Sequence, residues 1–353
     1  MKQFFKFTLT ILSILIIHSS VFGQQTDDYS KKIDSLILLN SPRKFNGVIP
    51  ITQNSKTKYA KVFGYSDFDK KILLTLKDNF RIQSNSKQIT AVLVLKEVEK
   101  GKIDLNKPIR KYLPNLTQTW ADSVSVHQIL NMSSGILEID KPLRFKPGTD
   151  FHYSNPSYGL LGQLIEKITG KKFIDVANNL FKDLGMKNTY CHERNKPNSN
   201  LINGYWQTKD SLEVVNFNNL NFTDESWKNF IPAGGIISNA VDLNIWDRKL
   251  HNGKILKNKS YVAMINSTTV DSDFTFGETK SNYGYGVNIN EEKPYKYIGH
   301  AGRGLGFVSL KFYIPEKNLD VIILENIYNR DVNIVYHYEK SIRQIILKSI
   351  LLK

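Results

Sequence analysis

The sequence predicts an α+β fold in which an antiparallel sheet, built from both ends of the chain, is flanked by helices and interrupted by a mostly helical lobe. Alternating apolar and polar residues, typical of strands, occur near the start of the chain and again in its last third. Between these regions the apolar residues recur at helical spacing, and no internal repeat is found. A cleft between the sheet and the inserted lobe is the expected binding site.

The first 23 residues have the layout of a secretory signal peptide. Lys2 and Lys6 precede an apolar run at 7–17, and the small-residue end Val21-Phe22-Gly23 follows. The run is short for a membrane span, although an uncleaved N-terminal anchor stays open as an alternative. We expect a periplasmic or secreted protein without stable membrane insertion after cleavage. Its mature domain would be 24–353, with a sheet lobe at about 28–83 and 255–353 and a helical lobe at about 84–254.

Bulk composition narrows the class of protein. The chain has 353 residues, 41% of them hydrophobic, and can bury a large core. Cys191 is the only cysteine, so no internal disulfide can form, and export without disulfides favours a bacterial periplasm. The net charge is +15, or +13 after subtracting Lys2 and Lys6, but the lysines are scattered and no nucleic-acid motif occurs. We interpret the charge as a solvated basic surface and expect no nucleic-acid partner.

The N-terminal part of the mature chain predicts a helix and then a hairpin. Residues 28–39 carry apolar side chains at helical spacing, which predicts an amphipathic opening helix. Segments 46–51 and 59–65 alternate like strands, and the polar stretch 53–56 between them favours a hairpin.

The sequence predicts a second helix, which begins near Ser84. Apolar residues recur at i, i+3, i+4 and i+7 over 91–98, and Gly101 ends the run. Ser84 is therefore expected at the N-terminal end of a helix with one buried face.

The middle of the chain predicts mainly helices. Helical patterns occur at 126–132, 156–169, 173–184 and 240–251. The stretch 191–230 is rich in asparagine and other polar residues, which predicts long loops or a lobe-specific insertion.

The final third predicts antiparallel strands and a closing helix. Strand patterns occur at 285–288, 295–298, 307–313 and 319–325. An apolar stripe within 333–352 predicts a helix that packs on the sheet.

Ser84-Asn85-Ser86-Lys87 places a hydroxyl and an amine on one helix face, because positions three apart are neighbours there. A lysine kept neutral by burial can remove the serine proton, and the helix N-terminus favours negative charge on the oxygen. Ser-x-x-Lys occurs three times, but the copy at 41–44 contains a proline and the copy at 55–58 lies in the hairpin. The plainer alternative is a capping serine beside a solvated lysine.

Tyr153-Ser154-Asn155 is the only Tyr-x-Asn in the chain. A phenol near Lys87 can share protons with it, and the Asn155 amide can hold a substrate carbonyl or orient the lysine. The plainer alternative is a tyrosine packed at a helix start beside an N-capping residue.

His300-Ala301-Gly302 follows a predicted strand and precedes Arg303. Glycine lets a backbone approach a ligand closely, so an edge strand here could offer a backbone N–H to an oxyanion, assisted by His300. The motif is unspecific, since His251-Asn252-Gly253 matches it as well. The plainer alternative is an ordinary turn histidine.

In combination these motifs resemble the serine β-lactamase and penicillin-binding protein superfamily, in particular its class C-like branch. The resemblance covers nearly all of the mature chain. Met132 stands where the family's His-Thr-Ser-Gly turn usually has a histidine. Further matching stretches are Phe80-Arg81-Ile82-Gln83, Gly101-Lys102-Ile103-Asp104-Leu105 with Pro108, Met132-Ser133-Ser134-Gly135, Phe145-Lys146-Pro147-Gly148, Leu184-Gly185-Met186, Pro232-Ala233-Gly234-Gly235 and Asn326.

The resemblance implies a β-lactamase/transpeptidase-like fold and an acyl-serine mechanism without a cofactor. It implies that Ser84 is the acylated nucleophile and that Lys87 and Tyr153 handle its protons. Asn155 would contact the acyl side chain of the substrate and Lys87. The third motif, His300, Gly302 and Arg303, would bind substrate, with the backbone N–H groups of Ser84 and Arg303 as the oxyanion hole.

One departure from the family pattern bears on the substrate. β-Lactamases generally carry Lys-Thr-Gly or Lys-Ser-Gly at the third motif, and neither tripeptide occurs here. His300 replaces a permanent ammonium by a group that is mostly neutral at pH 7. We therefore expect an exported hydrolase of esters or peptide-like amides, related to peptidases, carboxypeptidases and esterases, with weak or no β-lactamase activity. Its substrate would be a small molecule or short peptide, with cell-wall fragments among the candidates.

Two other classes of function were weighed. A non-catalytic binding protein for cell-envelope or peptidoglycan fragments could retain the same fold. A metalloenzyme is disfavoured, because none of the seven histidines forms His-Glu-x-x-His or His-x-His, and no metal ligand is predicted.

Overall fold

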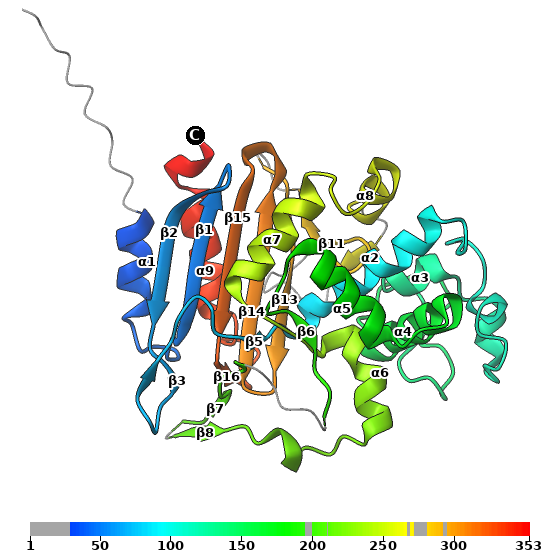
Figure 1. Cartoon of the computed structure of the whole chain (residues 1–353), viewed down its shortest axis with the longest axis horizontal. Helices are drawn as coiled ribbons and strands as arrows, with labels where there is room; N and C mark the ends of the chain where they lie inside the picture. Colours follow the sequence, from blue (N-terminus) through cyan, green and yellow to red (C-terminus); the bar gives the residue numbers. More distant parts are fainter. Residues whose placement is uncertain (1–28, 195–199, 210, 267–268, 272–280, 292–294) are drawn as a thin grey trace, which may run out of the picture.

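An eight-stranded antiparallel sheet, joining both ends of the chain, forms the centre of the computed structural model (Figure 1). The structure describes residues 29–194, 200–209, 211–266, 269–271, 281–291 and 295–353, so the proposed signal peptide lies outside it. The strands run in the order β10-β11-β12-β13-β14-β15-β1-β2, and β15 pairs with β1, which confirms the predicted joining of the chain ends. They are β1 (Gly47–Gln53), β2 (Lys56–Phe63), β10 (Thr269–Asp271), β11 (Ser281–Tyr283), β12 (Asn288–Asn290), β13 (Tyr297–Gly304), β14 (Phe307–Ile314) and β15 (Leu319–Glu325).

Both faces of this sheet are covered. In β15, Val321 and Ile323 pack with α1 (Tyr29–Ile37) and α9 (His337–Leu347), while Ile322 and Leu324 face the opposite core. Successive side chains of a strand point to opposite faces, so a strand buried on both sides has an almost continuous apolar sequence. Figure 1 shows α1 and α9 on one face and α7 (Ala240–His251) across the other.

The helical lobe stands beside the sheet and surrounds α2 (Ser86–Glu99) (Figure 1). Every residue of α2 from Ser86 to Leu95 is buried, which corrects the expectation of an amphipathic helix with one buried face. The other helices of the lobe and its neighbourhood are α3 (Val126–Leu130), α4 (Asn155–Thr169), α5 (Phe173–Leu184), α6 (Asp224–Gly234) and α8 (Asn258–Met264).

Short sheets and 3₁₀ turns join these elements. One three-stranded sheet, β5 (Phe80–Arg81), β9 (Ile236–Ser238) and β6 (Tyr190–Cys191), leads directly into the 3₁₀ turn η1 (Gln83–Asn85). The remaining short strands are β3 (Tyr65–Asp67), β4 (Ile72–Leu73), β7 (Tyr205–Gln207), β8 (Leu212–Val214) and β16 (Ile327–Asn329). The remaining 3₁₀ turns are η2 (Ile109–Lys111), η3 (Thr119–Asp122), η4 (Phe217–Asn219), η5 (Pro315–Lys317) and η6 (Ile350–Leu352).

Several element boundaries differ from the sequence prediction. The region 191–230 contains short strands and the start of α6, where long loops were expected. A capping box between Thr223 and Ser226 starts α6, and Pro232 near its end obscured the helical pattern. The strand predicted at 285–288 is instead β12, at Asn288–Asn290. The strand predicted at 295–298 continues to Gly304 as β13, and the closing helix predicted within 333–352 ends at Leu347. Within the described residues, no helix is both long and apolar enough to cross a bilayer.

A buried ionic cluster ties the two ends of the chain to the sheet. Arg43, with no exposed surface, donates two hydrogen bonds to Glu325, at 2.8 and 2.7 Å, and one to Glu339 at 2.9 Å. It thereby links the segment before β1 to the end of β15 and to α9. Burial and the adjacent Glu325 raise the pKa of Glu339. Because two carboxyl groups share this one guanidinium, its loss would leave them buried without a cation.

The substitution Arg43→Met should therefore cost about 3–5 kcal/mol of unfolding free energy, measured by urea denaturation. Lys61→Met is the matched control, because Lys61 pairs with Asp34 at 2.8 Å where both side chains are more than one third exposed. That surface pair should contribute less than about 1 kcal/mol. Equal losses in the two variants would contradict a structural role for the cluster.

Candidate active site

Ser84 lies in the tight turn η1, between β5 and the first turn of α2. The residue before it, Gln83, has φ of 50°, a conformation that costs energy for a residue with a side chain. Gln83 is held there by a hydrogen bond from its Nε2 to the Gly304 carbonyl oxygen, at 2.7 Å. Neighbouring Asn85 is buried and donates to Ser309 Oγ at 2.9 Å. Ser84 itself is only partly buried, so its hydroxyl is held in place and still accessible.

Lys87 Nζ is completely buried and surrounded by three oxygen atoms. It lies 3.2 Å from Ser84 Oγ, 2.7 Å from Asn155 Oδ1 and 2.8 Å from the Ala233 carbonyl oxygen. Burial lowers the pKa of Lys87 well below its usual value. No carboxylate forms an ion pair with Lys87 within the described chain. The environment therefore favours the neutral amine.

The protonation state of Lys87 decides what these contacts can do. A neutral amine has two N–H donors and one lone pair. The two carbonyl oxygens can only accept, so they take the two N–H groups. The lone pair is then left for the Ser84 hydroxyl, which donates to it. This is the arrangement that a general base requires in order to activate a serine.

Tyr153 completes the surroundings of the amine. Lys87 Nζ lies over the face of the Tyr153 ring, 4.7 Å from its centre, and 5.6 Å from the centre of the Tyr158 ring. Tyr153 also contacts His300, with ring centres 6.1 Å apart. The structure thus places the Tyr153 ring next to Lys87 and His300, as the sequence predicted. The proton-transfer role of its hydroxyl stays a prediction.

His300 is buried, and both of its ring nitrogens have partners within the protein. Nδ1 lies 2.5 Å from the Ala301 carbonyl oxygen, which can only accept, so Nδ1 carries the proton. Nε2 lies 3.0 Å from Tyr283 Oη and accepts its hydrogen bond. Burial, together with the nearby Lys87, lowers the pKa of His300 to about 3. His300 is therefore a neutral side chain that anchors Tyr283, and it offers no cation to a substrate.

Gly302 lets β13 pack against the nucleophile turn. A Cβ at this position would lie 2.7 Å from the Ile82 carbonyl oxygen and 2.8 Å from Gln83 Cβ. The neighbouring strand β12 pairs with β13 only over Tyr297–Gly299, so the rest of that edge faces η1. The predicted edge strand is therefore an interior strand of the sheet, and only its end beyond Gly299 lacks pairing with β12 and lies next to the nucleophile turn.

Arg303 points away from this edge. Its side chain is exposed, with the guanidinium 5.6 Å from the centre of the Tyr336 ring, on the sheet face covered by α9. His300 lies on the opposite face, beside Tyr153. The Arg303 side chain therefore does not reach a substrate beside His300, and only the Arg303 backbone N–H stays a candidate for substrate binding.

A cavity of about 290 Å³ adjoins Asn155, which is itself exposed to solvent. The cavity lies between α4 and α6, and its apolar lining comes from Ile139, Pro156, Leu160 and Phe230. Asn155 therefore connects this apolar space to the Lys87 amine.

Sequence reasoning named Ser84, Lys87, Tyr153 and Asn155, but it missed the supporting groups. Tyr283 had no sequence signal of its own, and the matching stretch Pro232-Ala233-Gly234-Gly235 did not show that the Ala233 carbonyl contacts Lys87, because both roles depend on contacts between distant segments. In the described part of the chain, no group of three or more His, Cys, Asp or Glu side chains could hold a metal ion.

Comparison with known proteins places this chain in a family. The family model for beta-lactamase matches residues 43–341. Protein flp of Staphylococcus aureus (strain MRSA252) is 25% identical over 90% of this chain and 67% of its own length. The putative penicillin-binding protein PbpX of Bacillus subtilis is 26% identical over 81% of this chain and 71% of its own length.

Two solved structures share the fold. The D-amino acid amidase of Ochrobactrum anthropi SV3 superimposes with a TM-score of 0.74 at 22% identity, covering 91% of this chain and 99% of the amidase. The penicillin-binding protein homologue of Pyrococcus abyssi gives a TM-score of 0.71 at 26% identity, covering 84% of this chain and 73% of the homologue. The chain therefore belongs to the beta-lactamase family, as a β-lactamase-related serine hydrolase.

Proposed function

We propose that the protein is an exported hydrolase that cleaves an ester or a peptide-like amide through an acyl-enzyme on Ser84. The observation that carries this proposal is the buried Lys87 amine, which lies 3.2 Å from the Ser84 oxygen and forms no ion pair with a carboxylate of the described residues. Within the superfamily, placement in the class C-like branch stays a prediction.

In the first half-reaction, Lys87 takes the Ser84 proton as the serine oxygen bonds to the substrate carbonyl carbon. The carbonyl oxygen becomes an oxyanion, for which the backbone N–H groups of Ser84 and Arg303 are the proposed donors. Each such donor typically contributes ~10²–10³ in rate. The proton then passes, by way of Lys87 and Tyr153, to the leaving amine or alcohol as its bond to the carbonyl carbon breaks. In the second half-reaction, water attacks the acyl-enzyme, the acid leaves and Ser84 regains its proton.

Two features support a neutral substrate with an apolar acyl side chain. The cavity beside Asn155 has the volume and lining to take such a side chain. His300 supplies no positive charge for a carboxylate on the leaving side, because it is neutral and engaged with Tyr283. Three proteins that share the fold fit this class: the D-amino acid amidase, a D-stereospecific amidohydrolase and the hydrolase EstCE1. Short, neutral peptide amides and esters are thus the candidates that we favour over β-lactams.

Export rests on residues 1–23, whose sequence has the layout of a signal peptide. We propose a periplasmic or secreted location for the mature domain 24–353. N-terminal sequencing of protein recovered from the periplasmic fraction should begin near Gln24. Recovery of an intact Met1 in washed membranes would instead support the uncleaved anchor.

A fluorophosphonate probe should label Ser84, as shown by peptide mapping, and Ser84→Ala should abolish both labelling and turnover of a neutral ester. The matched control is Ser55→Gly, since Ser55 begins another Ser-x-x-Lys, lies at φ of 61° and tolerates glycine there. This control should label normally. A folded wild-type protein that takes no label and turns over no ester, and binds envelope fragments equally well with or without Ser84, would instead be a non-catalytic binding protein.

The kcat/KM of the enzyme should rise with pH along a single acid limb. Lys87 must lose its proton in order to act as a base, so activity disappears as the pH falls through the lowered pKa of Lys87. Asn155→Asp would put a carboxylate next to Lys87 Nζ and raise the pKa of Lys87. The midpoint of the acid limb should then shift to a pH about 1–3 units higher. Asn155→Ala is the control without charge. A limb at the same pH in all three proteins would rule out Lys87 as the titrating base.

Substrate charge gives a separate check. A neutral aminoacyl amide should have a kcat/KM at least about tenfold above that of the same amide extended by a residue with a free carboxylate. Ordinary steady-state assays measure both. A preference for the carboxylate form would show that another cation reaches the leaving side and would contradict the role given to His300.

A further inference from the structure

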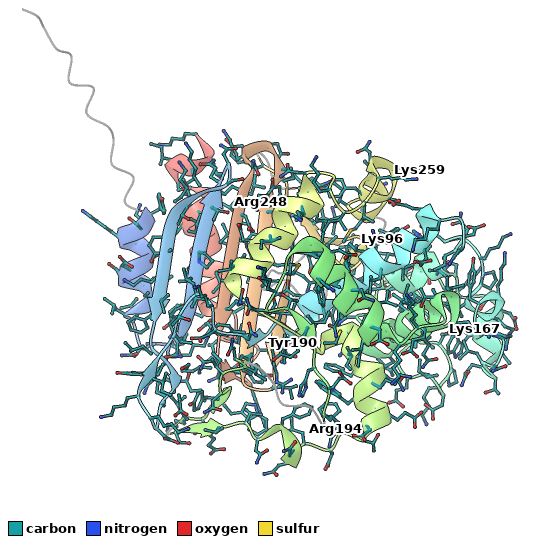
Figure 2. The ribbon with its side chains drawn as sticks, viewed as in Figure 1. Lys96, Lys167, Tyr190, Arg194, Arg248 and Lys259 are labelled. Atoms are coloured by element: carbon teal, nitrogen blue, oxygen red, sulfur yellow. The ribbon has the colours of Figure 1, made fainter. Side chains whose placement is uncertain are left out.

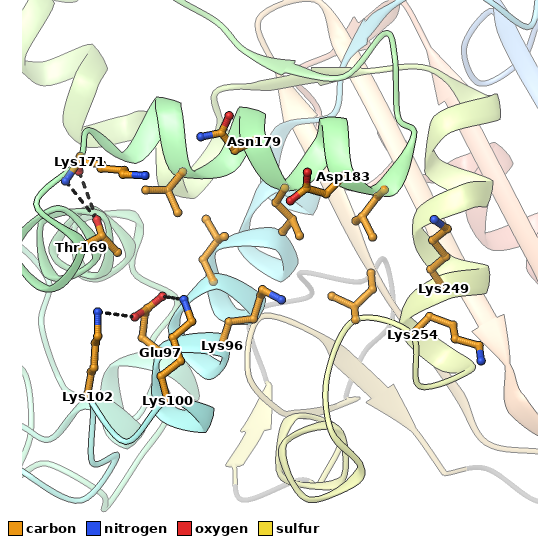
Figure 3. Close-up of a pocket in the computed structure, with 15 residues that line it drawn as sticks. Lys96, Glu97, Lys100, Lys102, Thr169, Lys171, Asn179, Asp183, Lys249 and Lys254 are labelled. Carbon is orange, nitrogen blue, oxygen red and sulfur yellow. Dashed lines mark hydrogen bonds and ion pairs between the residues drawn. The ribbon is translucent and has the colours of Figure 1, made fainter.

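A second concave site lies in the helical lobe, at the opposite end of α2 from the nucleophile. It is a groove of about 540 Å³ bounded by the C-terminal half of α2, the end of α4, one face of α5 and the end of α7 (Figure 3). Along an α-helix each residue rises 1.5 Å, so Lys96 lies roughly 18 Å along α2 from Ser84. The groove is therefore separate from the proposed catalytic site.

The groove concentrates lysines that are far apart in the sequence. Its lining has two carboxylates, Glu97 and Asp183, and six lysines: Lys96, Lys100, Lys102, Lys171, Lys249 and Lys254. Figure 2 shows basic side chains on the helical lobe, including Lys96 and Lys167, and others on α7 and α8, including Arg248 and Lys259, whereas Figure 3 shows the six lysines around this one depression. The scattering seen along the sequence thus hides a local cluster.

Acidic side chains neutralise only part of the positive charge of these lysines. Glu97 is nearly buried, and its two oxygens face Lys100 at 2.6 Å and Lys102 at 3.7 Å. In the described chain, Lys96, Lys171, Lys249 and Lys254 take part in no ion pair with an acidic side chain. Four ammonium groups that line this one groove are therefore without an ion-pair partner among the described residues.

The helix ends reduce the positive charge of the groove but do not cancel it. α2, α4 and α7 all end here, and each C-terminus contributes roughly −0.5 charge. With the two carboxylates also subtracted, an excess of roughly two to three positive charges remains. Mutual repulsion of the lysines is relieved when a multivalent anion enters.

We propose that this groove binds a compact, multivalent, phosphate-bearing anion. Its volume lies in the range of small-molecule sites. Lysines act as mobile point charges, which suits phosphate groups and requires no planar, two-pronged geometry. Leu93, Val176 and Ile255 in the lining offer apolar contact to an organic body that carries the phosphates. A flat anionic bilayer, in contrast, would meet only the rim of a concave site.

Inorganic tripolyphosphate is the probe, titrated calorimetrically into the mature protein at low and at physiological salt. Binding should be saturable and weaker at the higher salt. The groove variant should bind at least about tenfold more weakly; it combines Lys96→Gln, Lys171→Gln, Lys249→Gln and Lys254→Gln. A control variant that loses the same charge at exposed sites elsewhere should change affinity less than about twofold; it combines Lys56→Gln, Lys58→Gln, Lys259→Gln and Lys348→Gln.

Thermal denaturation should show that both variants are folded. Absence of saturable binding to wild type, or equal loss in the two variants, would overturn the proposal, because net charge would then explain the interaction. Binding to phosphatidylglycerol vesicles without binding to tripolyphosphate would also overturn it and would point to a membrane surface. The titration measures no catalysis, so its outcome does not depend on Ser84 being acylated.

Discussion

The chemistry of this protein depends on keeping one amine out of water without giving it a counter-ion. Lys87 Nζ lies among Ser84 Oγ, Asn155 Oδ1 and the Ala233 carbonyl oxygen, all neutral groups. A buried carboxylate at any of these positions would keep Lys87 protonated, so that Lys87 could not act as a general base. The site is therefore defined as much by the neutrality of its polar groups as by their positions, and the neutral His300 nearby follows the same rule.

The fold supplies the burial that this amine needs. α2 is enclosed by the other helices and the sheet, and α4 and α6 each contribute one oxygen to Lys87, from Asn155 and Ala233. From the sheet side, β13 presses against η1 at Gly302, and Ser309 of β14 donates a hydrogen bond to the Ile82 carbonyl oxygen at 2.8 Å. Four elements from three parts of the sequence thus surround Lys87 and the adjacent turn η1, which leaves the nucleophile little freedom to move.

Sequence patterns went furthest where the interaction is local. The spacing of Ser84 and Lys87 predicts their contact from helix geometry alone, and short, largely apolar runs bounded by turns predict the central strands β14 and β15. Features set by tertiary contacts could not be derived this way. The full burial of α2, the protonation pattern of His300 and the direction of the Arg303 side chain each depend on which distant segment packs beside them. The helix α6 was hidden for a different reason, since its proline and polar start resemble a loop.

The order of the strands also governs when the site can exist during synthesis. Ser84 and Lys87 leave the ribosome more than two hundred residues before the β13–β14 hairpin that packs against the nucleophile turn. β1 likewise cannot complete its pairing until β15 has been made. Contacts of such long range form slowly. A nascent chain that already carries both motif residues has no strand against which to fix them. The newly made polypeptide is thus inert toward acyl compounds around it until its last third has folded against the nucleophile turn.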